Sequence, residues 1–521
     1  MVFSKSSAVS TKVSQYIDKG AVKTIVLAGG FGKRLGIACD DKINRWAYPK
    51  PSLTVGSRRI IDFSIGAANE MGIRKMVFAT YYLKESIEFL AKNRARELEI
   101  STECVEETEP RDTAGACKFI IENKGWYKGD NQIIILSADI IHNLDLINPF
   151  QCHLEKNASA TIVVNPVPWA DMYRFGSVRL EGMPGREEFK TDEEFKERVS
   201  EWVTKNLGSM KKIVQFREKR PSSFEEFMSL KDTNLKEAVA LNEIYRNLEK
   251  KYKDEKKENR RQSIEKEIRK FHLALSTLNN SSIYITSSHL WHTFLPFITF
   301  KETPNPFSDF GGHIFPALTA QKEEDIMGFP LSQELRREIL AGEFPFYAYI
   351  MPDKNNHDKQ SYWVDAGVTS QLLKVNQDVL RGLIYVGLGV DTRFERDNKN
   401  KAWTGYNTYI AEGAQIVPLR EGANEHEISS IVGHDVVIEK GARVEGSVIG
   451  SFVEIGKNVK IKNSVVMSPH FKKREEKGQV IIGDGAEITD SIVVGADIEP
   501  DKKYYRQVIV EPLGGVVTEE I

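Results

Sequence analysis

Short apolar runs alternate with helical patterns over residues 21 to about 180. Residues 75–80, 133–136 and 160–164 are strand-like apolar runs, and residues 84–93 have the periodicity of a helix. Apolar runs that are continuous are typical of strands covered on both faces. The pattern therefore predicts an α/β domain with a buried, mostly parallel sheet, whose ligands bind beyond the carboxyl ends of the strands.

From about residue 405 onward, aliphatic residues recur every six positions. The series with this interval are Ile410 and Ile416; Val432, Ile438 and Val444; Ile449, Ile455 and Ile461; and Ile482, Ile488 and Val494. One inward-facing aliphatic residue in every six is the spacing of a parallel β-helix, in which each hexapeptide forms one face of a coil. We expect the interruptions near 418–430 and 468–480 to protrude as loops.

This change of pattern divides the chain into four parts. We expect a polar N-terminal tail over 1–20, an α/β domain over 21–385, a linker over 386–404 and a β-helix over 405–521.

Two charged stretches, about 182–210 and 222–272, interrupt the α/β pattern. The second contains apolar residues along one helix face: Leu241, Ile244, Leu248 and Tyr252. We expect this face to pack on the α/β domain, on a second subunit or within a helical hairpin. A solvated, weakly packed insertion is the alternative.

Composition narrows the functional classes. The 521 residues are enough for more than one domain, and a formal net charge of −2 provides no attraction to nucleic acid or to an anionic membrane. The first 20 residues lack an apolar signal segment, and no run approaches the roughly 18 apolar residues that span a bilayer. The four cysteines lack the spacing of a zinc site or disulfide framework. We expect a cytoplasmic protein that binds neither nucleic acid nor membrane.

A glycine-rich turn follows the apolar run that ends at Leu27. Its glycines allow close approach of backbone N–H groups to a ligand, and Lys33 and Arg34 add positive charge where phosphates would lie. A P-loop needs Ser or Thr after the lysine, and the dinucleotide fingerprint needs a third glycine where Leu35 stands. The turn therefore predicts a triphosphate-binding loop of another kind; a tight surface turn is the alternative. Its nucleotide-binding residues are Leu27, Ala28, Gly29, Gly30, Gly32 and Lys33.

The segments after this loop resemble those of the sugar-1-phosphate nucleotidyltransferases, and most closely the ADP-glucose pyrophosphorylases (glucose-1-phosphate adenylyltransferases). They are Pro49-Lys50-Pro51, the Arg-Arg-Ile-Ile-Asp-Phe segment 58–63 and the Asn-Glu-Met-Gly-Ile-Arg-Lys segment 69–75. The resemblance covers most of the chain apart from the tail and the two insertions. It implies a Rossmann-like nucleotidyltransferase domain followed by a left-handed β-helix, and a dimeric or tetrameric homo-oligomer.

The reaction implied is attack of a sugar-1-phosphate oxygen on the α-phosphate of a nucleoside triphosphate, with release of pyrophosphate. ATP and glucose-1-phosphate are the best substrates on this resemblance, giving ADP-glucose for glycogen synthesis. It assigns Arg34 and Lys50 to the phosphates as catalytic residues, and Asp139 and Asp365 to Mg²⁺. A hard cation of this kind prefers one or two carboxylates together with phosphate and water oxygens. An Asp after a strand can alternatively serve as a turn or helix cap.

The resemblance also assigns residues to the sugar phosphate. Lys219 matches a phosphate-binding lysine, although Arg220 stands where the family has proline, and a solvated lysine is the alternative. Gly176 lies on the sugar-phosphate side, and Asp309 is expected to support it rather than to catalyse.

The chain differs from the family it resembles at the positions that recognise the nucleotide base. Tyr81 and Arg111 replace two glutamines, and neither side chain can both donate to and accept from adenine as an amide does. Thr113 and Ala114 keep the residue types of the family, and the resemblance implies that they bind the nucleotide. The stretch from Leu35 to Lys50 is also longer than usual. We therefore expect a base preference that is weaker than, or different from, strict adenine.

Three other functions stay open. The chain could be a guanylyl-, thymidylyl- or uridylyltransferase of the same family, or a catalytically weak regulatory or sugar-nucleotide-sensing relative. An acyltransferase site in the β-helix would rest on His434, the one histidine in a clear coil of the repeat.

Overall fold

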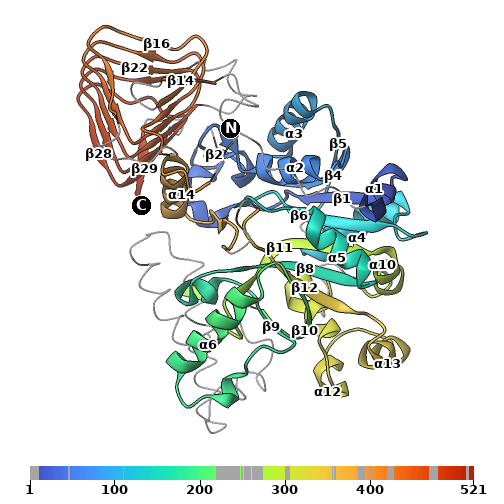
Figure 1. Cartoon of the computed structure of the whole chain (residues 1–521). Coiled ribbons are helices and arrows are strands. Elements are labelled where there is room, and N and C mark those ends of the chain that lie inside the picture. Colours follow the sequence, from blue (N-terminus) through green and yellow to red (C-terminus); the bar gives the residue numbers. More distant parts are fainter. Residues whose placement is uncertain are drawn as a thin grey trace.

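An α/β domain and a β-helix pack side by side in the computed structural model (Figure 1). The structure describes residues 11–44, 47–109, 111–218, 247, 250, 251, 260, 274–299, 306–354, 356, 359–384, 386, 394–397, 402–418, 427–468, 479–511 and 516–521. The apolar stripe at 241–252 and the predicted loops at 418–430 and 468–480 lie wholly or mostly outside these residues. Among the described helices, none is long and apolar enough to cross a bilayer.

Nine of the described strands form the central sheet of the α/β domain. In spatial order they are β5 (Ser101–Glu106), β4 (Lys75–Thr80), β1 (Val22–Leu27), β6 (Gln132–Ser137), β11 (Leu278–Ser287), β8 (Ala160–Pro166), β12 (Phe346–Ile350), β10 (Met210–Arg217) and β9 (Ser177–Leu180). The four from β5 to β6 are mutually parallel, as the continuous apolar runs predicted. Strand β11 then runs antiparallel to both of its neighbours, β6 and β8.

Helices cover both faces of this sheet. The described helices of the domain are α1 (Thr11–Asp18), α2 (Ile61–Glu70), α3 (Lys84–Leu98), α4 (Asp112–Lys124), α5 (Ile147–Glu155), α6 (Asp192–Lys205), α10 (Ser288–Phe294), α11 (Phe315–Leu318), α12 (Glu323–Ile326), α13 (Gln333–Ala341) and α14 (Thr369–Leu380). Helices α1, α2, α3 and α5 share one apolar core with the sheet, and α4, α6 and α10 to α13 share the other. Successive residues of β1 alternate between the cores, Ile25 facing one and Val26 the other.

Part of the segment assigned to a polar tail is helical. Helix α1 packs Val13 into the core beside α5, and Tyr16 donates a hydrogen bond to Asp130 at 2.6 Å. Val13, Tyr16 and Ile17 are spaced i, i+3, i+4, so they form one apolar face. The charged stretch 182–210 likewise contains α6, whose Phe195 and Val199 are buried in the core.

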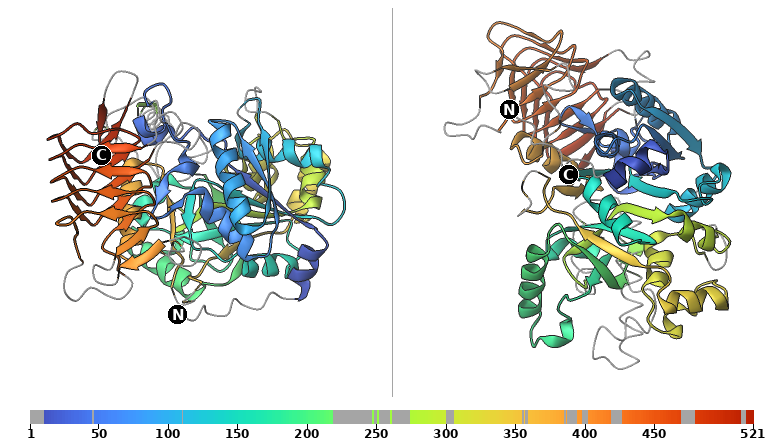
Figure 2. Two further views of the ribbon diagram at one scale, coloured as in Figure 1. Left: turned by 90° about the horizontal axis from the view of Figure 1, so that it is seen from above. Right: turned by 45° about the vertical axis from the view of Figure 1, so that its right-hand side comes forward.

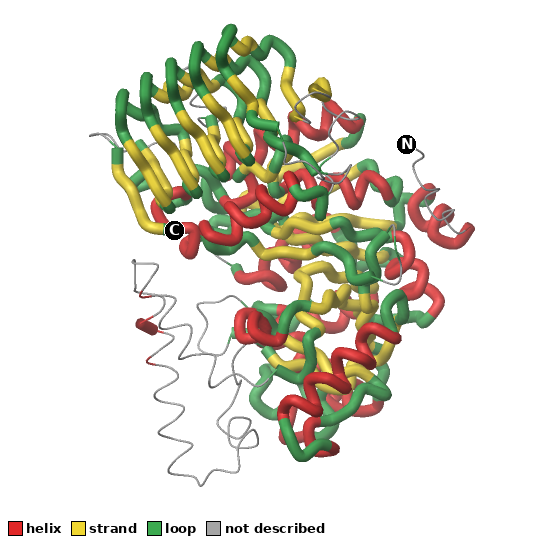
Figure 3. The backbone as a smooth tube through the Cα atoms, turned by 60° about the vertical axis from the view of Figure 1, so that its left-hand side comes forward, coloured by secondary structure: helices red, strands yellow, loops and turns green. Residues whose placement is uncertain are grey.

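The C-terminal domain is a β-helix with three faces, and the six-residue interval is confirmed. The first face is β14 (Phe394–Asp397), β15 (Ala402–Gly405), β18 (Ile431–Val432), β21 (Val448–Ile449), β24 (Val465–Met467), β27 (Ile492–Val494), β29 (Gln507–Val510) and β30 (Val517–Glu520). The second is β16 (Tyr409–Ile410), β19 (Val437–Ile438), β22 (Val453–Ile455) and β25 (Val480–Ile482), and the third is β17 (Gln415–Ile416), β20 (Arg443–Glu445), β23 (Lys460–Lys462), β26 (Glu487–Thr489) and β28 (Lys503–Tyr505). Figure 3 shows these strands stacked coil upon coil, in the arrangement of a left-handed β-helix.

Parallel pairing stacks equivalent residues of successive coils. Ile438 pairs with Ile455, and Ile455 with Ile482, all of them fully buried. Strands β14 and β15 extend the first face into residues 394–405, the part of the chain that we assigned mainly to the linker.

The first face of the β-helix packs against the α/β domain (Figure 2). Val448, Val465 and Val508 share an apolar core with Leu372 and Val379 of α14. The same core contains Leu35, Ile37 and Ala38, which immediately follow the glycine-rich turn. The β-helix therefore supports the segment that leads away from the predicted phosphate loop.

Candidate functional site

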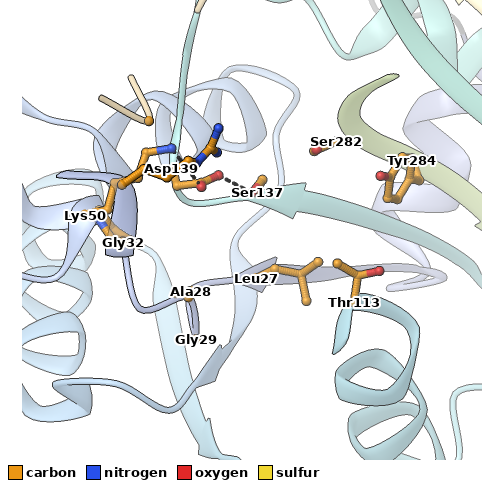
Figure 4. Close-up of a pocket in the computed structure, with 14 residues that line it drawn as sticks. Leu27, Ala28, Gly29, Gly32, Lys50, Thr113, Ser137, Asp139, Ser282 and Tyr284 are labelled. Atoms are coloured by element: carbon orange, nitrogen blue, oxygen red, sulfur yellow. Dashed lines mark hydrogen bonds and ion pairs between the residues drawn. The ribbon is translucent and has the colours of Figure 1, made fainter. Parts of the chain in front are cut away.

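A cavity of about 320 Å³ opens at the carboxyl ends of β1 and β6. Its lining residues are Leu27, Ala28, Gly29, Gly30, Gly32, Arg34, Lys50, Pro51, Thr113, Ser137, Asp139, Ser282, Tyr284 and Gly367. Figure 4 shows Lys50 and Asp139 at one end of the cavity, and Thr113, Ser282 and Tyr284 at the other. The predicted glycine-rich loop, a lysine and a carboxylate thus meet in one pocket.

Strand pairing fixes the glycine-rich loop at the base of the cavity. Leu27 is in register with Ser137, and the Ala138 N–H donates to the Leu27 carbonyl at 2.9 Å. Gly32 has φ of 63°, a left-handed conformation that favours glycine, and leads into the helical turn η1 (Lys33–Ala38). This turn carries Arg34 to the cavity.

A short two-stranded sheet brings the two predicted metal aspartates together. Strand β7 (Ile140–His142) pairs antiparallel with β13 (Trp363–Asp365), and Asp365 is in register with Ile140. Asp139 immediately precedes β7, so its carboxylate lies near that of Asp365, although the two residues are far apart in the sequence. Ser137 donates to Asp139 Oδ1 at 2.6 Å and orients that carboxylate.

Lys50 lies between the two aspartates. It follows Pro49 at the start of the turn η2 (Lys50–Ser52), and its side chain is buried. Its Nζ lies 2.9 Å from Asp139 Oδ2 and also donates to Asp365 Oδ1. Burial alone would lower the pKa of Lys50, but the charges of Asp139 and Asp365 outweigh it and raise the pKa above its ordinary value. The ammonium is therefore charged at neutral pH.

Arg34 reaches the same carboxylate from the glycine-rich side. Its Nη2 lies 3.3 Å from Asp365 Oδ2, and a Cβ on Gly367 would come within 3.0 Å of that nitrogen. Burial would raise the pKa of Asp365, but Lys50, Arg34 and Arg174 hold it below the usual range of a carboxyl. The site combines the side chains of Lys50 and Arg34 with those of two aspartates.

The donors present fit a hard divalent cation that also binds substrate oxygens. Among the described residues, no group of three or more His, Cys, Asp or Glu side chains could hold a metal ion without other ligands. Mg²⁺ usually takes one or two carboxylates and completes its shell with phosphate and water oxygens. Asp139 and Asp365, already gathered around a positive charge, provide such a pair.

At the far end of the cavity, Thr113 is held by Asp309. Thr113 donates to Asp309 Oδ2 at 2.9 Å, and Asp309 Oδ1 accepts from the Gly312 N–H at 2.7 Å, capping the turn η6 (Phe310–Ile314). The Phe310 N–H donates in return to the Thr113 hydroxyl at 3.1 Å. Asp309 thus acts on the cavity through Thr113.

Several predicted site residues do not line the cavity among the described residues. Ala114 is buried in α4, and its N–H donates to the Ser308 carbonyl. The Arg111 guanidinium lies over the Phe119 ring at 4.3 Å. Tyr81 lies behind Gly29, and Gly176 lies against Glu218 and Phe216. Lys219 and the side chain of Lys33 lie outside the residues described.

Five lining residues were not predicted from the sequence as site residues: Pro51, Ser137, Ser282, Tyr284 and Gly367. Ser282 and Tyr284 belong to β11, where the polar run Asn279–Ser282 interrupts the apolar pattern. That polar interruption could have indicated from the sequence that this part of the strand faces a ligand site. Glu107 does not line the cavity, but it lies against the glycine-rich loop, where a Cβ on Gly29 would be 3.1 Å from its Oε1.

His434 holds the first coil of the β-helix. Its ring stacks on Tyr406 with centroids 4.2 Å apart and lies 4.7 Å from the Phe394 ring. Its Nδ1 accepts a hydrogen bond from the Tyr406 N–H at 3.0 Å. These contacts are those of a packed histidine, and they give no support to an acyltransferase site.

Comparison with known proteins matches both domains. Residues 23–382 match the nucleotidyl transferase family, and residues 412–516 match the family described as GlmU-like, C-terminal hexapeptide. Two relatives named glucose-1-phosphate adenylyltransferase align over most of the chain. The protein of Clostridium kluyveri is 24% identical over 505 residues, covering 92% of this chain and 97% of its own length. That of Bacillus thuringiensis is 23% identical over 464 residues, covering 85% and 91%.

A shorter similarity involves guanylyltransferases. The probable mannose-1-phosphate guanylyltransferase 1 of Oryza sativa subsp. japonica is 30% identical over 152 residues, covering 29% of this chain and 40% of that protein. The similarity to this relative spans less than half of its length.

Proposed function

The chain belongs to the nucleotidyl transferase family of sugar-1-phosphate nucleotidyltransferases, and we propose that it transfers a nucleotidyl group from a nucleoside triphosphate to a sugar-1-phosphate. The observation that carries this proposal is Lys50, held between Asp139 and Asp365 beside the glycine-rich loop. This arrangement supports the proposal, because it gathers two cations and two carboxyl groups beside a cavity in which two polyanions would meet.

An oxygen of the sugar-1-phosphate attacks the α-phosphorus, and the bond from that phosphorus to the oxygen bridging to the β-phosphate breaks. Pyrophosphate leaves with the electron pair of this bond. Backbone N–H groups of the glycine-rich loop and the Arg34 guanidinium bind the triphosphate, and Lys50 neutralises charge at the α-phosphate. Holding both substrates in this geometry provides the remaining acceleration.

A divalent cation completes the site, and Asp139 and Asp365 would hold it. When bound, Mg²⁺ supplies neutralisation of phosphate charge. Arg34 and Lys50 would then keep the two carboxylates in place, because both are paired with Asp365 and Lys50 also with Asp139.

For the substrates, ATP and glucose-1-phosphate are the first candidates, giving ADP-glucose for glycogen synthesis. The relatives that align over 85% and 92% of this chain carry the name glucose-1-phosphate adenylyltransferase, which supports this choice. Guanylyl transfer is the second candidate. The relative named as a probable mannose-1-phosphate guanylyltransferase supports it.

The experiment measures pyrophosphate release with five nucleoside triphosphates, several sugar-1-phosphates and Mg²⁺. We expect turnover with at least one purine triphosphate, giving the corresponding nucleoside diphosphate sugar. Absence of release with every pair, from protein that binds nucleotide, would favour instead the regulatory or sensing relative. A matched reaction without sugar-1-phosphate separates transfer from hydrolysis.

A further inference from the structure

Helix α14 lies between the β-helix and the rest of the α/β domain (Figure 1). On one side, Gln377 donates a hydrogen bond to the Gly446 carbonyl of the β-helix at 2.9 Å. On the other side, the buried side chain of Asn376 accepts from a backbone N–H at 2.8 Å and donates to a carbonyl at 3.0 Å, both in the hairpin 54–59. This hairpin closely follows Lys50, so α14 is fixed to the β-helix and to the segment that carries Lys50.

The next residue of the helix, Asp378, carries a buried carboxylate that reaches the strand of Asp365. Its Oδ2 accepts a hydrogen bond from the Tyr362 hydroxyl at 3.0 Å, and its Oδ1 lies 3.6 Å from the guanidinium of the exposed Arg381. Burial and then the Asp378 charge raise the pKa of Tyr362, so the hydroxyl keeps its proton and remains the donor. A buried carboxylate is costly without such donors, and hydrogen bonds to carboxylates are among the stronger ones in proteins.

Strand β13 is held on both of its faces. Tyr362, which directly precedes the strand, and Val364 pack on the apolar core that contains residues of α14. Trp363 belongs to the core on the opposite side, where its indole N–H donates to the Ser281 carbonyl of β11 at 3.2 Å. The alternation of side chains along a strand therefore attaches β13 to α14 through one face and to the central sheet through the other.

Asp365 ends this strand, and residues 366–368 connect it directly to the start of α14. The segment is thus attached to the same helix twice, covalently after Asp365 and through the hydrogen bond of Tyr362 before it. We propose that Asp378 is a positioning residue that, through Tyr362, sets where the Asp365 carboxylate lies. This inference rests on the proposed nucleotidyl transfer. Because α14 also holds the segment of Lys50, the helix sets the place of Asp365 relative to that lysine.

A carboxylate that is already held in place binds a cation more tightly than one that must be ordered on binding, and partners of metal ligands typically change metal affinity or activity by roughly 10- to 100-fold. Tyr362 acts on Asp365 through the strand and not by direct contact. We therefore expect the effect of its hydroxyl at the lower end of this range. The quantity that reports it is the gain in triphosphate affinity that Mg²⁺ provides.

The test is calorimetric binding of ATP and GTP to the full chain, with excess Mg²⁺ and with EDTA. We expect Mg²⁺ to tighten binding to the wild type, and Tyr362→Phe to reduce this Mg²⁺-dependent ratio of Kd values by roughly tenfold for the triphosphate that binds more tightly. Asp378→Ala should reduce it equally, and the double variant no further, because each change removes the same hydrogen bond. Asp378→Asn, whose amide oxygen still accepts from Tyr362, should retain most of the ratio.

Tyr16→Phe is the matched control. It also removes a hydrogen bond from a tyrosine hydroxyl to a carboxylate, that of Asp130 at 2.6 Å, and neither residue lines the cavity. Its Mg²⁺-dependent ratio should equal that of the wild type. A wild-type affinity that ignores Mg²⁺, an unchanged ratio in Tyr362→Phe, or an equal loss in Tyr16→Phe would each overturn the proposal.

Binding is measured apart from turnover, so the two proposals fail differently. Triphosphate binding that depends on Mg²⁺ and on Tyr362, without pyrophosphate release for any substrate pair, would reject the proposed function and support the positioning role of Asp378 at the cation site. Pyrophosphate release by the wild type, with an unchanged ratio in Tyr362→Phe, would reject the positioning role alone. Absence of binding of both triphosphates would overturn both.

Discussion

Glu519 Oε2 accepts a hydrogen bond from the Ile37 N–H at 3.0 Å and joins the last strand of the β-helix to the turn that carries Arg34. Between Arg34 and Ile37, Gly36 has φ of 57° and ψ of −139°, and a Cβ there would collide with Glu519 Oε2. Glycine is therefore required for this approach. Because strand β30 pairs with β29, the contact makes the β-helix part of the support of the predicted phosphate loop.

We predict that Glu519→Ala lowers kcat about three- to tenfold, which corresponds to about 1 kcal/mol for a lost hydrogen bond of this kind. Glu519→Gln should restore most of the activity, since an amide oxygen still accepts from Ile37. Glu520→Ala, on the same strand but exposed, is the matched control. Steady-state kinetics of pyrophosphate release measure the effect, and wild-type kcat in Glu519→Ala would show that the contact does not reach Arg34.

Local patterns predicted most of the elements of this fold. The strand expected at 75–80 is β4 residue for residue, and the six-residue interval located the coils of the β-helix. Both patterns can be recognised from residues that are close together in the sequence. The antiparallel position of β11 between β6 and β8 was not predictable, because this strand follows a long insertion and its partners are distant in sequence.

The site residues also divide into those that a local motif indicates and those that only the tertiary structure reveals. The glycine-rich loop, Lys50 and Asp139 could be selected from their motifs, and the structure brings them together in one cavity. The burial of Glu107 beside this loop was not predictable, because it stands in the acidic run Glu106-Glu107-Thr108-Glu109 and only the turn after β5 determines which carboxyl is buried. Burial of a charged residue is a tertiary property, and it raises the pKa of the Glu107 carboxyl to about 7.

We predict that the free energy of unfolding decreases in mild acid because His153 is buried in its neutral form. Its Nε2 donates to Gln132 at 2.9 Å, its Nδ1 accepts from Thr161 at 2.8 Å, and burial lowers its pKa to about 3. The unfolded chain binds a proton near pH 6.5, so this stability is complete above pH 6.5 and is lost as pH falls from 6.5 towards 3. At pH 5 we expect a loss of about 2 kcal/mol from this group.

Urea unfolding at pH 7.5 and pH 5 measures this difference. His153→Gln, which retains one donor and one acceptor, should remove about 2 kcal/mol of the pH dependence, while the exposed His292→Gln should leave it unchanged. An equal pH dependence in wild type and His153→Gln would contradict a neutral His153.

We predict a homo-oligomer that associates through the second face of the β-helix. Along this face Tyr409, Val437, Glu454 and Ile481 are in register from coil to coil, and Tyr409 and Ile481 are 59% and 42% exposed. Burying such apolar side chains stabilises a subunit interface. Light scattering at micromolar concentration should give the mass of a dimer or tetramer.

Replacing Tyr409 and Ile481 together by lysine should reduce that mass to the monomer. Tyr505→Lys, on the third face and 63% exposed, is the control that should leave the assembly intact. A monomeric wild type would reject the homo-oligomer, and an intact assembly of the double variant would place the interface elsewhere.

We predict that the two aspartates form a single cation site. Asp139 and Asp365 meet around Lys50 because β7 pairs with β13, so each carboxylate contributes charge to the same small volume. Asp139→Asn and Asp365→Asn should each lower kcat at least about 100-fold, since several kcal/mol of charge stabilisation is lost. Chelation of divalent ions should abolish wild-type turnover, and added Mg²⁺ should restore it.

Asp145→Asn separates this role from a general effect of removing a carboxylate. Asp145 is close in sequence, but its Oδ1 accepts a hydrogen bond from the Ile147 N–H at 2.9 Å and its Oδ2 accepts one from Asn148 at 2.6 Å, at the start of α5. The amide oxygen of an asparagine can replace one of these two acceptors, and Asp145 does not line the cavity. This control should keep wild-type turnover and the wild-type Mg²⁺ requirement. Near-normal kcat of Asp139→Asn or Asp365→Asn at saturating Mg²⁺ would remove that aspartate from the cation site, and Lys50 would then pair with it for structural reasons alone.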